Sequence, residues 1–210
     1  NTTVYGDEGN DFIYLGPGQH FVDAGLGNDY VDTGSGGGEI YCSGGNDEVQ
    51  HGVGNIFVHL GEGDDNFVGN IGDVEIFGGL GNDDISGSIG DMVIWPGAGK
   101  DIVKTGIGNN IIIIGSACEV EEGEIIKGSM GHDIVKSPFS RQQLESMGVS
   151  FYSIEEFQII SEKTSECACI RYVKNGIGSG DGLSWSSAFN NIQDAIDSAY
   201  EAVSSEQFSE

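Results

Sequence analysis

A nine-residue repeat runs without interruption from residue 6 to residue 113, and it constrains the fold more than any other feature of the chain. Twelve consecutive blocks have glycine at their fourth position and a β-branched or aromatic residue at their eighth. A glycine at a fixed place favours a tight turn with positive φ, and the apolar position favours a short strand whose middle side chain points inward. Each block therefore predicts a six-residue turn followed by a three-residue strand.

Two blocks form one coil of 18 residues, with two strands and two turns. Stacked about 4.8 Å apart, the coils would form a column of roughly 29 Å with two facing parallel sheets. A single coil cannot bury its apolar residues, so the array has to fold as a stack. The predicted fold class is all-β, a parallel β-roll or β-solenoid, followed by a small mixed α/β C-terminal cap with one amphipathic helix.

Composition and charge exclude several classes of protein. The chain has 36 Gly but only 3 Pro, which excludes collagen, and its 38% hydrophobic residues are too many for a disordered linker. The formal net charge of −26 opposes binding to nucleic acid or to an anionic membrane, because both require basic surfaces. The sequence has no run of about 18 apolar residues, so we expect no membrane-spanning helix.

The sixth position of the blocks alternates between two kinds of residue. Odd-numbered blocks carry aspartate there, one coil apart, so six carboxylates are expected to stack along one edge of the solenoid. Stacked carboxylates repel one another unless a cation lies between them, and a hard ion with six or more oxygen ligands favours Ca²⁺ over Zn²⁺ or Mg²⁺. The candidate ligands are Asp11, Asp29, Asp47, Asp65, Asp83 and Asp101. The even-numbered blocks carry His20, Gly38, Ile56, Val74, Met92 and Asn110 at this position.

The blocks resemble the RTX nonapeptide, G-G-x-G-x-D-x-U-x, which is a calcium-binding repeat. Residues 78–86, with the sequence Gly-Gly-Leu-Gly-Asn-Asp-Asp-Ile-Ser, match it at every defined position. The resemblance implies that successive turns on one edge share each ion, so that the six aspartates would bracket about five Ca²⁺ ions, roughly half the number expected with aspartate on both edges. The alternative is that the aspartates only favour turns and bind nothing, but turn preference alone would not skip alternate blocks.

The opposite edge is predicted to close without ions, by apolar packing of its third and sixth positions. This ladder consists of Val53, Ile56, Ile71, Val74, Ile89, Met92 and Ile107. The outward positions of the even-block strands are also more apolar and aromatic than those of the odd blocks, which is typical of a contact surface. That face is covered either by residues 137–210 or by a partner chain or a glycan surface.

The nine-residue register slips after Ile113. Glu119 lies 18 residues after Asp101, and residues 128–136 restore one block with Asp133 at its sixth position, so both acids are candidates to extend the ion column by one site. We therefore assign residues 1–136 to the β-roll and 137–170 to a capping segment. The cap is expected to contain a short capped helix at 140–145, ending before Gly148, and one or two strands within 150–160.

The four cysteines, Cys42, Cys118, Cys167 and Cys169, are compatible with an oxidising compartment. A bridge from Cys118 to Cys167 or Cys169 would staple the cap to the array, and free buried thiols are the alternative. Four cysteines allow three pairings, and the sequence does not choose among them.

Residues 171–210 form a third region, with an amphipathic helix near its end. Its residues Tyr172-Val173, 180–185 (Gly-Asp-Gly-Leu-Ser-Trp), Ala188-Phe189 and 192–196 (Ile-Gln-Asp-Ala-Ile) resemble the entry segment of right-handed parallel β-helix, or pectin-lyase-like, domains. The rungs that hold the chemistry of that family do not follow, so no catalytic residue is carried over.

The sequence therefore predicts a calcium-binding extracellular structural or adhesive module, not an enzyme. It would be secreted or displayed at a cell surface, and we expect a mature or excised segment because neither an initiator Met nor a signal peptide is present. Expected partners are Ca²⁺, a second copy of the chain through the open N-terminal edge or the apolar even-block face, and a glycan or cell-surface ligand. The alternative is a non-catalytic accessory region of a secreted polysaccharide-active β-helix enzyme.

Overall fold

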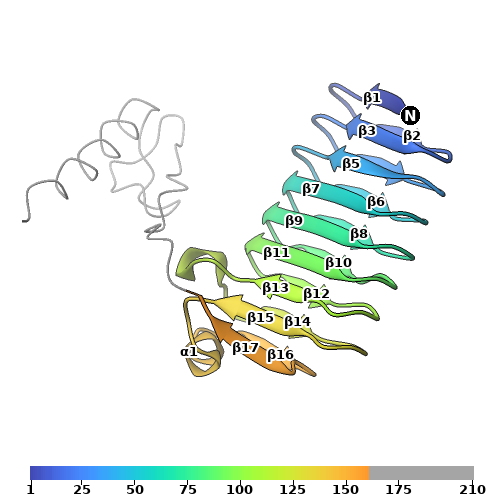
Figure 1. Cartoon of the computed structure of the whole chain (residues 1–210). Helices are drawn as coiled ribbons and strands as arrows, with labels where there is room; N and C mark the ends of the chain where they lie inside the picture. The colour runs from blue at the N-terminus through green and yellow to red at the C-terminus, as the bar shows by residue number, and fades with distance from the viewer. Residues whose placement is uncertain (161–210) are drawn as a thin grey trace, which may run out of the picture. The chain divides into compact units, whose positions relative to one another are not determined.

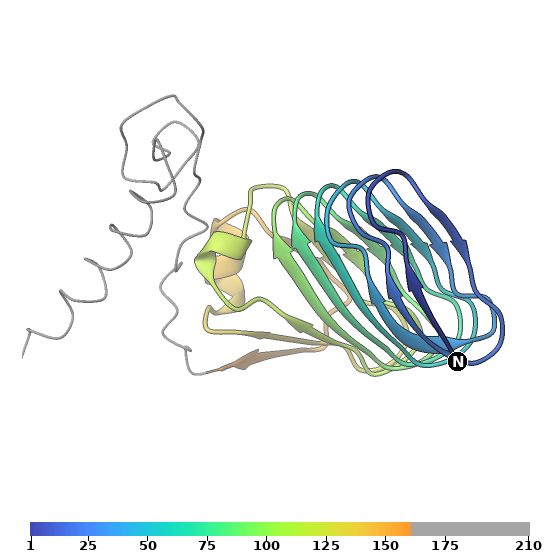
Figure 2. The same cartoon turned by 90° about the horizontal axis from the view of Figure 1, so that it is seen from above.

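The computed structural model describes residues 1–160, which form a parallel β-solenoid (Figure 1). Successive strands alternate between two sheets that face each other, and the coils follow one another as nested loops when seen from above (Figure 2). The nine-stranded sheet contains β1 (Thr2–Tyr5), β3 (Gln19–Asp23), β5 (Gly37–Tyr41), β7 (Ile56–Glu62), β9 (Val74–Leu80), β11 (Met92–Ala98), β13 (Ile111–Ile113), β15 (Ile134–Ser137) and β17 (Glu156–Ile159). The eight-stranded sheet contains β2 (Phe12–Tyr14), β4 (Tyr30–Asp32), β6 (Glu48–Gln50), β8 (Asn66–Val68), β10 (Asp84–Ser86), β12 (Ile102–Lys104), β14 (Ile125–Lys127) and β16 (Ser150–Tyr152).

The 18-residue coil predicted from the repeat is confirmed by the strand register. Ile13 pairs with Val31, and Val31 pairs with Val49, so equivalent positions of successive coils lie side by side. The eighth-position residue of every block is buried between the two sheets, where it contacts its equivalents above and below. The two facing columns of these residues, one from each sheet, form the centre of the core, and buried residues of the turns such as Leu60 and Met92 complete it. Such a core can form only when coils stack.

The fourth-position glycines are required by the close approach of stacked turns. Gly81 has a φ of +125°, and a Cβ atom built on it would lie 2.0 Å from the carbonyl oxygen of Gly63, one coil away. An L-residue would meet both backbone strain and a steric clash there. The invariant glycine of the repeat therefore sets the spacing of the turns as well as their shape.

The C-terminal end of the described region continues the same two sheets. The predicted capped helix is present as α1 (Arg141–Ser146), with a capping box between Ser140 and Gln143. The sequence predicts one or two strands after it, and two are present: β16 and β17 pair with β14 and β15, so the segment expected to cap the array adds one more coil to it. A second short helix, η1 (Ala117–Glu119), lies in the connection between β13 and β14.

The predictions for residues 171–206, namely the amphipathic helix and the likeness to β-helix entry segments, lie outside the described residues. The same holds for a bridge from Cys118 to Cys167 or Cys169. Within the described part, Cys42 is free and buried.

Candidate metal centre

The six aspartates of the odd-numbered blocks lie on one edge of the solenoid, as predicted. Each ends a turn that leads from the nine-stranded to the eight-stranded sheet, on the left-hand side of Figure 1. We call this the aspartate edge; its turn segments, numbered by the repeat, are residues 6–11, 24–29, 42–47, 60–65, 78–83 and 96–101. In the last three segments, β7, β9 and β11 extend over the first three residues. The apolar edge, on the other side, consists of residues 15–20, 33–38, 51–56, 69–74, 87–92 and 105–110.

Hydrogen bonds connect the six aspartates into a ladder. The backbone N–H of Asp11 donates to Oδ1 of Asp29 at 2.8 Å, and the N–H of Asp29 donates to Oδ1 of Asp47 at 2.7 Å. The same bond recurs at 2.7, 2.9 and 2.9 Å up to Asp101. Each bond joins residues 18 apart, so every carboxylate from Asp29 onward is fixed by the backbone of the preceding coil.

The second carboxylate oxygen of each aspartate has no protein partner. Oδ2 of all six is buried without a hydrogen bond, and Asp29 to Asp101 are at most 3% exposed. A buried, unpaired carboxylate oxygen is strongly unfavourable, so a column of six requires a ligand or a proton. Hard oxygen donors in register fit Ca²⁺, which takes carboxylate and main-chain carbonyl oxygens.

The electrostatics of the ladder also call for positive charge. Burial, with a smaller contribution from the charges of neighbouring carboxylates, raises the pKa of Asp47, Asp65, Asp83 and Asp101 to about 7. Burial raises the pKa of Asp29 as well. A divalent ion between two carboxylates would remove the repulsion and hold both groups ionised.

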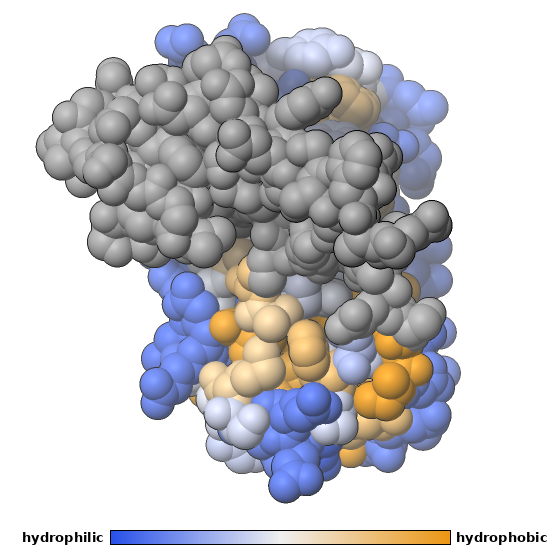
Figure 3. All heavy atoms as spheres, turned by 90° about the vertical axis from the view of Figure 1, so that its left-hand side faces the viewer, coloured by the Kyte–Doolittle hydropathy of each residue, from blue (hydrophilic) through white to orange (hydrophobic). Residues whose placement is uncertain are grey.

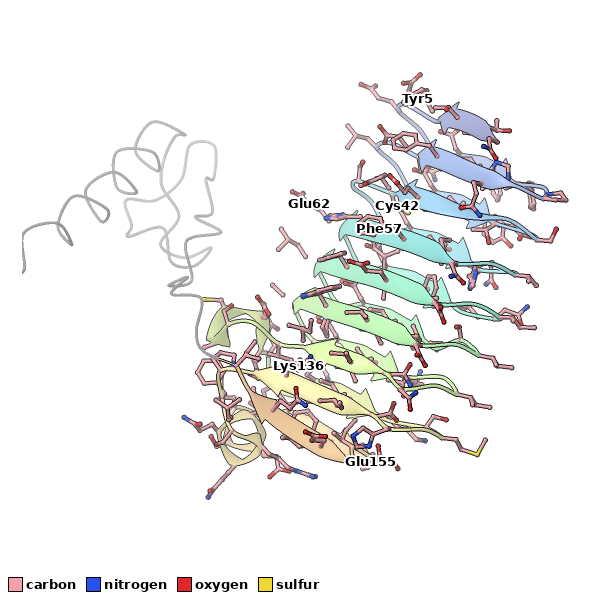
Figure 4. The ribbon with its side chains drawn as sticks, viewed as in Figure 1. Tyr5, Cys42, Phe57, Glu62, Lys136 and Glu155 are labelled. Atoms are coloured by element: carbon pink, nitrogen blue, oxygen red, sulfur yellow. The ribbon has the colours of Figure 1, made fainter. Side chains whose placement is uncertain are left out.

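Main-chain oxygens would have to complete the coordination of any ion. In the described residues, no three or more His, Cys, Asp or Glu side chains converge on one point. Cys42 lies at the first position of an aspartate-edge turn (Figure 4), but burial raises the pKa of its thiol well above the ordinary value, and the charges of Asp47 and Asp65 add to this. A neutral thiol is a poor metal ligand, so the edge has the character of a hard, all-oxygen site.

The apolar edge closes with protein atoms alone. Ile56, Val74 and Met92 are at most 5% exposed, which confirms burial of the sixth position. The backbone N–H groups of Ile56 and Val74 donate to the carbonyl oxygens of Asp73 and Asp91, so no side-chain acid is needed. The third position differs from the prediction: its residues pair across coils but stay half exposed, because the turn directs them outward. Their exposures are 45% for Val53, 46% for Ile71, 54% for Ile89 and 44% for Ile107.

A second ladder, which the sequence interpretation missed, runs along both edges at the fifth position. Asn10 accepts a bond from the N–H of Asn28 at 2.9 Å on the aspartate edge, and Asp73 accepts one from Asp91 at 3.0 Å on the apolar edge. These side chains are exposed and their acceptors are occupied. The signal was present, since nine of the twelve blocks have Asn or Asp at this position.

Glu119, a predicted ligand, is not the residue that follows Asp101 in the column. The turn between β13 and β14 spans residues 114–124, eleven residues where the repeat has six, so a count of 18 ends inside the insertion. Glu119 accepts bonds from the N–H of Gly115 and the hydroxyl of Ser116. The pairing of Ile102 with Ile125 places Glu124 in register with Asp101 instead. Glu124 is 1% exposed, its Oε2 atom lacks a partner, and burial raises its pKa to about 8.

The prediction for Asp133 is wrong about the edge. Ile134 pairs with Ile111, so Asp133 lies in register with Asn110 on the apolar edge. Its Oδ1 accepts from the side chain of Asn110 at 2.7 Å, and its Oδ2 accepts from the N–H of Ser129 at 2.8 Å. Both oxygens are satisfied, and its own N–H donates to Glu155, at the opposite edge from Glu62 in Figure 4. Asp133 therefore closes a polar network and leaves no oxygen for an ion.

The family comparison agrees with this geometry. The model of the RTX calcium-binding nonapeptide repeat matches four times, at residues 1–19, 5–40, 59–91 and 93–113. Residues 1–113 of the solenoid therefore contain RTX calcium-binding nonapeptide repeats. Neither a curated protein nor a solved structure matches the chain. Repeats of this family bind Ca²⁺. We call residues 6–113, the twelve nonapeptide blocks, the RTX array.

The outer face of the nine-stranded sheet of the RTX array carries a row of aromatic rings. Consecutive rings are 6.2, 5.6, 5.8, 5.6 and 4.2 Å apart between centroids. The row consists of Tyr5, Phe21, Tyr41, Phe57, Phe77 and Trp95; Tyr5 and Phe57 are labelled in Figure 4. Contacts of this kind stabilise neighbouring strands, and the rings remain partly accessible.

Among residues 1–160, no helix combines the length and the apolar character needed to cross a bilayer.

Proposed function

We propose that this chain is an extracellular structural module whose stack of coils is held together along the aspartate edge by Ca²⁺. The observation that carries the proposal is the column of six buried Oδ2 atoms without partners, each in register with the next. The apolar edge has no such column, so the ions would lie on one side only. Six aspartates would bracket about five ions, as expected from the repeat.

The mechanism is linkage between ion binding and folding. The aspartates are 18 residues apart in the chain and adjacent only in the stacked form, so an unfolded chain presents no site. Stability then rises with free calcium as RT ln(1 + [L]/Kd) for each site. The buried charge adds to this effect, because the ion-free stack has to hold several carboxylates in a poorly solvated column.

Thermal unfolding followed by circular dichroism tests the proposal. We expect the melting temperature in millimolar CaCl₂ to exceed that in EGTA by ten degrees or more, on the order of several kcal/mol for multiple sites. Asp65→Asn should reduce this difference, whereas Asp84→Asn, a control on the outer face that pairs with Lys104, should leave it unchanged. An identical melting curve in calcium and in EGTA would refute calcium stabilisation.

A structural role is proposed in preference to catalysis. In the described residues, the six buried aspartates of the aspartate edge are held in a ladder within the turns, and apolar residues fill the space between the sheets. Proteins with RTX repeats are typically secreted, and an array that folds only at the calcium concentrations found outside cells would suit export in an unfolded form. A calcium titration checks this: half-maximal folding far below micromolar calcium would argue against extracellular control.

Adhesion or self-association would use the outer face of the nine-stranded sheet. The row of aromatic rings supports this choice, because partly exposed aromatic rows favour protein contacts. Light scattering at high protein concentration, with and without calcium, tests it. Association that is weakened by Phe57→Ser is expected, and a strict monomer under all conditions would remove self-association.

A further inference from the structure

The aspartate edge ends in a turn that differs from all the others on that edge. Residues 114–124 replace the six-residue turn with eleven, and they carry four glutamates: Glu119, Glu121, Glu122 and Glu124. Strand pairing is unaffected, since β12 pairs directly with β14. Glu124 thus follows Asp101 where the repeat would have aspartate.

Two buried carboxylate oxygens at this end of the column lack partners. Asp101 is 0% exposed and Glu124 is 1% exposed, and Oδ2 of the first and Oε2 of the second make no hydrogen bond. The two residues belong to adjacent coils, because the N–H of Ile125 donates to the carbonyl of Asp101 at 2.9 Å. Within the ladder, the space between two successive coils, here called an interval, is flanked in the same way by two acids.

The insertion adds further negative charge to this interval. The charge of Glu121 acts on Asp101, and the charges of Asp101 and Glu119 act on Glu124. Four carboxylates therefore contribute negative charge to the space between the coil of Asp101 and the coil of Glu124. Glu119 is held by Gly115 and Ser116, so its position within the insertion is fixed.

We propose that Asp101 and Glu124 form a terminal divalent-cation site, with Glu119 and Glu121 supplying additional charge. The ligand is a hard cation, Ca²⁺ by its all-oxygen donors, and the extra carboxylates make this site bind more tightly than the internal intervals. The inference rests on the proposed calcium ladder but assigns a site outside the nonapeptide repeats.

Occupancy of the terminal site would fix the last coil to the array. The main-chain carbonyl of Glu124 accepts the N–H of Ser150, at the start of β16, at 2.9 Å, and the N–H of neighbouring Gly123 donates to the carbonyl of Gly148 at 3.1 Å. Apolar residues around this end, including Val120, Phe139 and Met147, pack partly buried against the core. Figure 3 shows hydrophobic residues gathered near these last coils, with hydrophilic residues on either side. An ion at Glu124 would hold this packing in place.

Calorimetric calcium titration of the full chain and three variants tests the site. Glu124→Gln should bind one ion fewer than the wild type, and the lost ion should be the tightest. Glu122→Gln, an exposed glutamate of the same insertion, is the matched control and should bind as the wild type does. Asp47→Asn should lose internal binding but keep the tight terminal ion.

Amide exchange supplies a second readout. Calcium should slow exchange at residues 115–124 and 148–150 in the wild type, Glu122→Gln and Asp47→Asn, but not in Glu124→Gln. If Glu124→Gln does not fold, Glu121→Gln replaces it, with an affinity for the tight ion lower by roughly tenfold.

Unchanged ion number and unchanged affinity in Glu124→Gln, or in Glu121→Gln if it is used instead, would overturn the terminal site while leaving the internal ladder intact. A wild-type chain that binds no calcium would remove both proposals.

Discussion

The aspartate edge and the apolar edge are built from turns of the same length, with glycine at the fourth position and a side-chain ladder at the fifth. They differ in how the N–H group at the sixth position is satisfied. On the aspartate edge the N–H of Asp47 donates to the carboxylate of Asp65, whereas on the apolar edge the N–H of Ile56 donates to the main-chain carbonyl of Asp73. The carboxylate leaves one oxygen unused, and the carbonyl leaves none. One side-chain choice therefore decides whether an edge is complete by itself or needs a ligand.

The largest effect expected from this difference is an inverted pH dependence of stability without calcium. The folded-state pKa of the four inner aspartates is raised to about 7, so the ion-free stack binds more protons than the unfolded chain between pH 4 and 7. Stability in EGTA is therefore highest near the ordinary aspartate pKa and falls as the pH rises through about 7. One group shifted this far contributes on the order of 4 kcal/mol.

Chemical denaturation at pH 5 and pH 8, in EGTA and in calcium, measures this effect. The pKa of His51 is lowered by burial, and this acts in the opposite direction, but it is one group against several. Saturating calcium should remove the loss at pH 8, because the bound carboxylates stay ionised. A chelated protein that is more stable at pH 8 than at pH 5 would contradict the buried-acid column.

The next effect comes from exchanging the chemistry of the two edges. Val74→Asp places a carboxylate at the buried sixth position of the apolar edge, where the equivalent residues of the adjacent coils are Ile56 and Met92. With no second buried carboxylate to share an ion, it should destabilise the stack by about 3–5 kcal/mol with or without calcium. Asp65→Asn should have the opposite signature, with little loss or a gain in EGTA and a clear loss in calcium. Unfolding titrations of both variants in both conditions give the comparison, and a calcium-dependent rescue of Val74→Asp would show that either edge can hold ions.

Much of this contrast could be predicted from the sequence, because the period of nine and the alternation at the sixth position are both visible there. The places of Glu124 and Asp133 could not be found by counting, since the five extra residues of the 114–124 turn break the spacing. Comparing short strings would have helped: residues 101–104, 124–127 and 133–136 read Asp-Ile-Val-Lys, Glu-Ile-Ile-Lys and Asp-Ile-Val-Lys. Each marks the end of a turn. The first two precede β12 and β14 of the eight-stranded sheet, whereas the third precedes β15 of the nine-stranded sheet and so lies on the other edge. The exposure of Ile71 and its equivalents depends on the direction of the side chain in the turn, which composition does not reveal.

A smaller effect separates the role of glycine in spacing the stacked turns from the role of the aspartate carboxylates. Gly81→Ala should destabilise the protein by roughly 2–4 kcal/mol, because the new methyl group would meet the Gly63 carbonyl at a strained φ. Gly44→Ala is the matched control on the same edge, since its nearest neighbour would be 3.6 Å away and its φ is ordinary, and it should be neutral or slightly stabilising. Equal melting temperatures for the two variants would show that the turns can move apart.

The smallest effect tests what the two edges share. Asn28→Ala removes the acceptor for the N–H of Asn46 on the aspartate edge, and Asp91→Ala removes the acceptor for Asn109 on the apolar edge. Each should cost about 1 kcal/mol, because the exposed N–H can turn to water. The two losses should be similar in EGTA. A loss several times larger on either edge would show that the fifth-position ladder carries more of the stability than its exposure indicates.

The enlarged turn at residues 114–124 has a consequence for how such a chain tolerates inserted sequence. Five additional residues change neither the pairing of Ile102 with Ile125 nor that of Ile111 with Ile134. A turn of the solenoid can thus be lengthened to display an inserted peptide while the strands on either side keep their pairing. A single residue added within a strand would turn its remaining inward side chains outward and its outward side chains inward. Grafted peptides should therefore be tolerated in the turns but not in the strands.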